Sequence, residues 1–119
     1  MKQDNTPQAV DSCHQLMLWL VPQLDKFPRN RRFTLGDKIE TTMLAILESL
    51  IVASYERNRR TSLNEANRKL TVVRHLWRLA MELKAVSHKS YEHGAKLMVE
   101  LGSQIGGWVK HEKSRKSLA

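Results

Sequence analysis

The sequence predicts an all-α protein, a single domain of 119 residues folded as an up-down-up-down antiparallel four-helix bundle. Apolar residues recur at intervals of three and four along four successive segments, which is the spacing of one helix face. The chain has only 5 glycines and 3 prolines, so it lacks the turn residues that many short strands would need. The connections are short, which places consecutive helices antiparallel. We expect helices over residues 7–27, 34–60, 63–86 and 88–112, followed by a frayed tail over 113–119.

The first predicted helix lies between two prolines. Pro7 suits an early helical position and Pro28 ends the segment, whereas Pro22 lies inside the helix and is expected to kink or split it. Its apolar stripe consists of Val10, Cys13, Met17, Leu20, Leu24 and Phe27.

The second predicted helix begins after a short basic loop. Thr34 is a good N-cap, and Asp37 adds a favourable negative charge to the first turn. Glu40 lies within the broad apolar arc of this helix. We expect it to pair with an arginine across the bundle or across a subunit interface, because an unpaired buried carboxylate is costly.

The third predicted helix opens with Ser62-Leu63-Asn64-Glu65, which has the form of a capping box. Its apolar residues cover more than half of the helix circumference, which exceeds what packing within one bundle requires. The excess predicts a homo-oligomer whose interface includes Leu76, Leu79 and Leu83. The alternative is that Leu76 and Leu79 lie on a broad seam inside the bundle.

The fourth predicted helix follows Ser87, a candidate N-cap. Gly102 and Gly106 are four residues apart and therefore lie on one face of this helix. Because each glycine weakens a helix by ~1 kcal/mol relative to alanine, the pair indicates a close approach of another helix.

No pattern of catalytic residues is present. The chain lacks the Glu-x-x-His and His-Glu-x-x-His spacings of helical metal sites, and no two of its 5 histidines lie three or four residues apart on one helix. Cys13 lies on an apolar stripe, and the adjacent His14 diverges from it on a helix, so the two do not form a nucleophile–base pair. We expect no enzymatic activity, no metal site and no cofactor.

The cysteine content and the hydropathy pattern indicate a compartment. Cys13 is the single cysteine, so no internal disulfide can form, which fits a reducing environment. Residues 1–6 are polar and contain no apolar signal stretch, and no segment has the ~18 apolar residues of a membrane span. We expect a cytoplasmic protein with no membrane partner.

The net charge of +8 predicts a polyanionic partner, either nucleic acid or an anionic membrane surface. The apolar faces are needed for the bundle, which disfavours the membrane. Aromatic residues make up only 6% of the chain, so contacts to the nucleic-acid backbone are expected rather than base stacking. Cations gather near both expected ends of the bundle: Arg29, Arg31 and Arg32 at one end, and Arg57, Arg59, Arg60 and Lys110 at the other. A simpler explanation of these end groups is that they are solvated and complement helix C-termini.

A narrower signal lies in the middle of the third helix. Arg74 and Arg78 share a polar stripe with Asn67 and Thr71, and like charges four residues apart repel each other without a partner. A phosphate or an acidic protein surface along the stripe would relieve this repulsion. Glu82 would neutralise Arg78 within the helix instead, and the spacing alone leaves both explanations open.

Several segments, in their order and spacing, resemble the Avd proteins, which are the accessory variability determinants of diversity-generating retroelements. These segments are Phe27-Pro28-Arg29 and the run from Arg32 to Glu40; Ala66-Asn67, Leu70, Arg74 and Trp77-Arg78-Leu79-Ala80; and Tyr91, Glu100-Leu101-Gly102 and Gly106-Gly107-Trp108 with Lys110. The resemblance spans roughly residues 20–110. Four-helix proteins encoded in ribosomal RNA intervening sequences have a similar fold, but their Asn-Ile-Ala-Glu-Gly segment is missing here.

The resemblance implies a four-helix bundle assembled as a homopentameric barrel. It also implies a non-catalytic factor that binds the retroelement's reverse transcriptase together with RNA and DNA and supports mutagenic reverse transcription. By the same resemblance, Arg74 and Arg78 belong to the functional basic surface, and the wide apolar arc of the third helix belongs to the subunit contact. The alternative function is a protein-only scaffold or adaptor that recognises an acidic partner surface.

Overall fold

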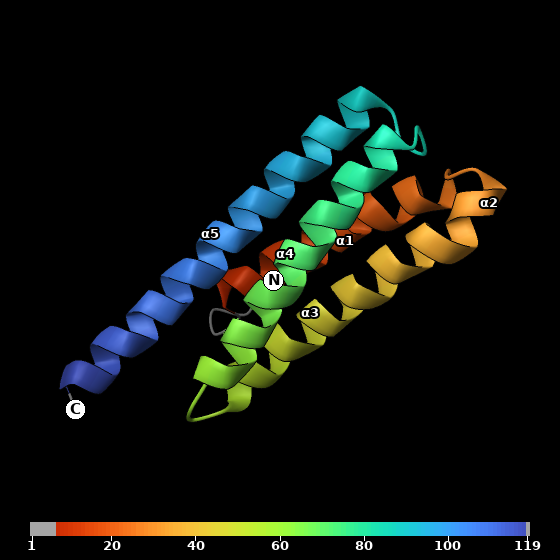
Figure 1. The fold of residues 1–119 in the computed structure, drawn as a ribbon. Coiled ribbons are helices and arrows are strands. Elements are labelled where there is room, and N and C mark those ends of the chain that lie inside the picture. The colour runs from red at the N-terminus through yellow and green to blue at the C-terminus, as the bar shows by residue number, and fades with distance from the viewer. Residues whose placement is uncertain (1–6, 119) are drawn as a thin grey trace, which may run out of the picture.

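The computed structural model describes the backbone of residues 7–118 and the side chains of residues 7–114. Within this range the chain forms helices and no strand. Four long helices, α1 (Gln8–Asp25), α3 (Asp37–Tyr55), α4 (Arg60–Glu82) and α5 (His88–Leu118), run alternately up and down (Figure 1). α1 packs against α3 and α5, and α4 packs against the same two helices. The predicted all-helical, four-helix fold is confirmed for these residues.

The segment between α1 and α3 is helical, whereas the sequence predicted a loop. α2 (Arg29–Arg31) begins directly after Pro28, and a π-helical turn, η1 (Arg32–Gly36), joins it to α3. Thr34 is therefore not an N-cap, because its hydroxyl donates back to the carbonyl oxygens of Asn30 and Arg31 at 3.4 Å. The predicted helix start at residue 34 is wrong because Pro28, with its fixed φ and missing N–H, already provides a helix start.

The turn between α3 and α4 also differs from the prediction. α3 ends at Tyr55 and α4 begins at Arg60, so the expected boundaries at residues 60 and 63 are wrong. No capping box forms, because the Ser62 hydroxyl donates to Oε1 of Glu56 at 2.6 Å and Glu65 pairs with Lys69. A nearby carboxylate therefore takes the hydroxyl that was expected to cap the helix.

The turn between α4 and α5 has the geometry of a Schellman motif. Lys84 has φ 64°, its N–H donates to the oxygen of Met81 at 3.0 Å, and the N–H of Ala85 donates to the oxygen of Ala80 at 2.8 Å. This motif ends α4 at Glu82, before the predicted end at residue 86. The predicted cap of α5 is confirmed, because the N–H of Ser90 donates to the Ser87 hydroxyl at 3.1 Å.

Two further predictions concern a kink or split of the first helix at Pro22 and a frayed C-terminal tail. α1 continues through Pro22 without being split. Pro22 is exposed, so water can reach the carbonyl that lacks its helical N–H partner. α5 extends to Leu118, so the expected frayed tail is helical over residues 113–118, and Ala119 lies outside the described residues.

Trp77 of α4 is fully buried and joins α4 to its neighbours. Its ring stacks 6.4 Å from the ring of Phe27 and meets the ring of Trp19 edge-on at 6.1 Å. Its Nε1 donates to the backbone oxygen of Tyr91 at 2.9 Å. A Cβ at Gly94 would lie 2.7 Å from this nitrogen, which is too close for any side chain. Gly94 therefore lets α5 lie directly against the indole.

The predicted close helix approach at Gly102 and Gly106 is not found among the described residues. A Cβ at Gly102 would meet Leu70 at an ordinary 3.5 Å. A Cβ at Gly106 or Gly107 would meet no described atom within 4 Å. The tight contact is at Gly94, which the spacing of the glycines did not single out.

Candidate nucleic-acid interface

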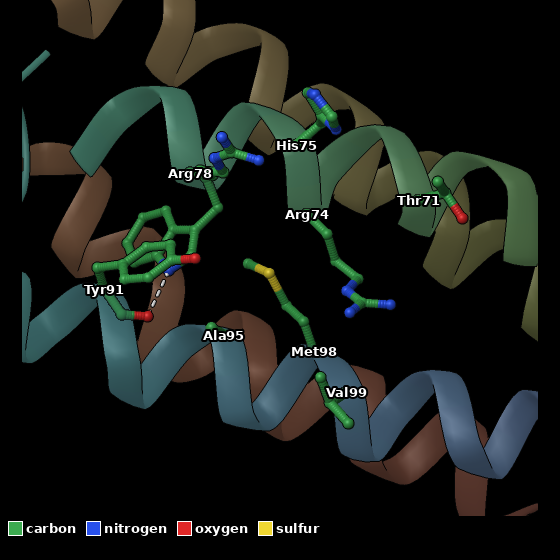
Figure 2. A pocket seen from close by; sticks show the side chains of 9 residues that line it. Thr71, Arg74, His75, Arg78, Tyr91, Ala95, Met98 and Val99 are labelled. Atoms are coloured by element: carbon green, nitrogen blue, oxygen red, sulfur yellow. Dashed lines mark hydrogen bonds between the residues drawn. The ribbon is translucent and has the colours of Figure 1, made fainter. Parts of the chain in front are cut away.

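A groove of about 350 Å³ runs between α4 and α5. Both arginines of the polar stripe predicted from the sequence, Arg74 and Arg78, line it. The other lining residues come from both helices and are shown in Figure 2: Thr71, His75 and Trp77 from α4, and Tyr91, Ala95, Met98 and Val99 from α5.

The groove combines a cationic wall with an apolar floor. Figure 2 shows the Arg74 side chain extending from α4 toward α5 and the Met98 side chain extending from α5 toward α4. His75 points away from the space between the two helices. Val99 is 51% exposed at the edge of the floor. An anion held at the wall would therefore lie beside apolar surface, where charge interactions are stronger than in bulk water.

The two arginines differ in how they are paired. Nε of Arg78 lies 3.3 Å from Oε2 of Glu82, but both side chains are more than half exposed. Exposed pairs of this kind contribute little to stability, and Arg78 can exchange Glu82 for another anion at low cost. Among the side chains of residues 7–114, none forms a hydrogen bond or ion pair with Arg74. The predicted neutralisation by Glu82 is found for Arg78 and does not extend to Arg74.

Thr71 is oriented within its own helix. Its hydroxyl donates to the backbone oxygen of Asn67 at 3.1 Å, one turn earlier in α4. This bond uses its donor, so the cationic groups that the groove offers to a ligand are the guanidinium groups of Arg74 and Arg78, and His75 and Tyr91 add further polar groups to the lining. The chemistry suits recognition of phosphate rather than of a nucleotide sequence.

Arg32 has a structural environment that the sequence did not reveal. Its guanidinium lies 3.1 Å from Asp25, 3.1 Å from Asp37 and 2.9 Å from Glu40. Although burial by itself would lower the pKa of Arg32, the hydrogen bonds and charges of Glu40 and Asp25 raise it above its ordinary value. Arg32 therefore joins the end of α1 to the start of α3.

The same contact resolves the predicted partner of Glu40. Glu40 does pair with an arginine, as expected. That arginine is Arg32 of the adjoining η1 turn, so the expected position across the bundle or across a subunit interface is wrong. The π-helical turn shifts the helix register between residues 32 and 37 and lets Arg32 reach Glu40.

The remaining predicted cations lie at the two ends of the bundle. Figure 1 shows the α1–α2 and α4–α5 turns at one end and the α3–α4 turn at the other. Arg29, Arg57, Arg60 and Lys110 are exposed, and Arg31 is half-buried. Arg59 differs from them, because its guanidinium lies 6.0 Å from the centre of the Trp108 ring and 3.5 Å from Glu112. The end groups are thus separate from the α4–α5 groove.

The predicted interface leucines are unequal in exposure. Leu79 is 41% exposed and Leu83 is 44% exposed, whereas Leu76 is half-buried and packs against the core. Val72, 47% exposed, continues the apolar stripe along α4. Leu76 thus has a role within a single chain, and the exposed stripe lies at Val72, Leu79 and Leu83.

Cys13 lies in the core, as its apolar stripe predicted, and burial raises the pKa of its thiol to about 12. Among the described residues, no three histidine, cysteine, aspartate or glutamate side chains lie close enough together to hold a metal ion. The same range contains no helix that is both long and apolar enough to cross a membrane.

The sequence did not identify the apolar floor that α5 contributes to the groove. The spacing of Tyr91, Ala95 and Met98 is typical of the apolar stripe of a helix, and Val99 directly follows Met98. Their positions four, three and one residues apart place them on one side of the helix, but only the packing of α5 on Trp77 shows which side faces Arg74. The pattern of α4 alone was enough to identify the cationic wall.

The comparisons with known proteins agree with this description. No curated protein and no solved structure matches the chain at a significant level. A family model described as bAvd-like matches residues 9–112, which cover most of each of the four long helices and every residue that lines the groove. The chain belongs to the bAvd-like family.

Proposed function

We propose that this protein is a non-catalytic accessory factor of a diversity-generating retroelement. It binds template RNA or cDNA through its basic surface and brings the nucleic acid to the retroelement's reverse transcriptase. The observation that carries the proposal is Arg74, a cation that extends into the α4–α5 groove beside Arg78 and has no partner among the described side chains. The net charge of +8 and the family membership support the same function.

The test is RNA binding by a variant with both Arg74→Ala and Arg78→Ala, measured over a series of salt concentrations. Each phosphate contact releases counterions, so removing two contacts lowers the affinity at low salt and flattens the salt dependence, by about two units of slope. Neither substitution changes the core, because both arginine side chains are exposed. The circular dichroism spectrum of the variant should therefore match that of the wild type.

The matched control is Lys38→Ala with Lys96→Ala, which removes the same charge from exposed positions outside the groove. This control should weaken binding only through the lower net charge. Equal losses in the two double variants would contradict a role for the groove. Tight binding of the reverse transcriptase without any RNA binding would favour the protein-only adaptor.

The exposed apolar stripe on α4 supports self-association as part of this function. Val72, Leu79 and Leu83 are each more than 40% exposed, which is costly to leave in water along one helix face. A homo-oligomer, a pentamer by analogy with the Avd proteins, would bury this stripe and repeat the basic groove around the assembly. Light scattering of the wild type and of Leu79→Lys with Leu83→Lys tests this, and a wild-type monomer would refute it.

A further inference from the structure

A second cavity, also about 350 Å³ in volume, lies at the end of the bundle where α1 and α4 begin. It is separate from the α4–α5 groove and shares no residue with it. Its walls are the first turn of α1, Arg59 before α4, and Gln104, Gly107, Trp108 and His111 of α5. This volume is at the lower end of the range for small-molecule sites.

The electrostatics of this end favour an anion. Both α1 and α4 start here, so the positive ends of two helix dipoles point the same way (Figure 1). Neither helix has a side-chain cap; the first turn of α4 contains no acidic residue, whereas the first turn of α1 contains Asp11. Arg59 and Arg60 nevertheless stand at the start of α4, where a cation is unfavourable without a nearby anion. Glu112 offsets part of the charge of Arg59 at 3.5 Å.

The walls also carry groups that fit a planar, hydrogen-bonding ring. The Trp108 indole is half-buried, and the Arg59 guanidinium lies over one face of its ring, 6.0 Å from the ring centre, so a base would stack on the other face. Oε1 of Gln104 is buried and has no hydrogen-bond partner among the described residues. Because this oxygen is closed off from solvent, a ring amino group reaches it only when the Gln104 side chain turns toward the cavity.

Gly107 lines the cavity without a side chain of its own. It lies inside α5, where glycine is unfavourable, yet a Cβ at this position would meet no described atom within 4 Å. No packing contact among the described residues explains the missing side chain, and the same holds at Gly106, but Gly107 alone of the two lines the cavity. Glycine commonly occurs where a ligand approaches the backbone closely.

We propose that this cavity binds a nucleoside monophosphate unit, with its base against Trp108 and its phosphate toward Arg59 and the starts of α1 and α4. The unit is either a free nucleotide or the terminal nucleotide of a bound strand, and the second case rests on the proposed function.

The test uses Gly107→Leu, with Gly106→Leu as the matched control. Both positions are open and both changes favour the helix, but only residue 107 lines the cavity. Calorimetric titration of the full chain with adenosine monophosphate should show binding by the wild type and by Gly106→Leu. Binding by Gly107→Leu should be weaker by roughly tenfold or more, because the leucine fills the space of the base.

A second titration with a 5′-phosphorylated single-stranded oligonucleotide separates the two sources. A loss specific to Gly107→Leu for the oligonucleotide alone assigns the cavity to a strand end, and such a loss for adenosine monophosphate shows that the free unit suffices. The proposal is overturned when neither ligand distinguishes Gly107→Leu from Gly106→Leu. The double variant of Arg74 and Arg78 should bind adenosine monophosphate normally, so the two sites can fail independently.

Discussion

Arg32 and Arg74 are the same residue type in two regions of one molecule, and their environments separate a structural arginine from a candidate binding arginine. Arg32 lies against three carboxylates at the junction of α1 and α3. Arg74 extends into the α4–α5 groove, where no described side chain neutralises it. Both belong to basic segments of the sequence. The difference shows that the carboxylates around a cation, rather than the density of cations along the chain, indicate which charge is available for a partner.

The largest loss of stability is expected at Gly94, where α5 packs against the buried Trp77. In Gly94→Ala the new Cβ would lie within 3 Å of three atoms of the Trp77 indole, and the fully buried ring has little room to move. Overpacking of this kind costs typically about 1–3 kcal/mol, and the better helix propensity of alanine offsets up to ~1 kcal/mol of it. We expect a net loss of about 2 kcal/mol in the free energy of unfolding, measured by urea denaturation.

Gly106→Ala provides the control for this substitution, because it makes the same chemical change on the same helix at an open position. It should be neutral or stabilise the protein by up to ~1 kcal/mol. Equal effects at the two positions would show that the contact between α5 and Trp77 is looser than the 2.7 Å approach implies.

The next prediction compares the two arginines directly. Arg32→Met should lower the free energy of unfolding by about 1–2 kcal/mol, because it leaves three carboxylates together without a cation. Arg74→Met should change it by less than about 0.5 kcal/mol, because the side chain is exposed and unpaired. Methionine keeps the apolar part of each side chain in place, so the difference reports the charge.

RNA affinity should show the opposite order. Arg74→Met should weaken binding at low salt, and Arg32→Met should leave the affinity of the folded protein close to that of the wild type. Should Arg32→Met weaken binding as much as Arg74→Met at a temperature where both are folded, the distinction between the two regions would be lost.

The comparison also shows how far the sequence could be interpreted. Periodicity was sufficient for the four long helices and for the stripe of Arg74 and Arg78, because helical spacing is a local property. The predicted helix caps at Thr34 and Ser62 were wrong. Thr34 lies in a π-helical turn and donates to a backbone oxygen one turn earlier, and the Ser62 hydroxyl donates to the carboxylate of Glu56. Periodicity also failed to predict the contacts of Arg32 and the apolar floor that α5 gives the groove, since both depend on how separate helices pack together. Gly94 was missed for the same reason, because its partner Trp77 lies on another helix.

A smaller effect is expected at Cys13, on the reactivity of its thiol and on the pH dependence of stability. Burial raises the pKa of its thiol to about 12, well above its ordinary value, so the thiol stays protonated in the folded protein at neutral pH. It should react with a thiol reagent only through unfolding, at a rate that falls as stability rises. Because the pKa is higher in the folded state, this group contributes its full stability below pH 9 and loses that contribution as the pH rises toward 12. Rapid labelling of the native protein at pH 8 would contradict the burial, with Cys13→Ala as the unlabelled control.

The smallest change in stability is expected at Lys84, a cation in the turn that follows α4. Its backbone has φ 64°, a conformation that costs a residue with a side chain about 1 kcal/mol relative to glycine. Lys84→Gly should therefore raise the free energy of unfolding by about 0.5–1 kcal/mol, whereas Lys84→Ala removes the same charge and should give no such gain. RNA binding should decrease equally and slightly in both variants, because they lose the same charge. A larger loss in one of them would mean that the turn itself, and not only the arginines of α4, contacts the nucleic acid.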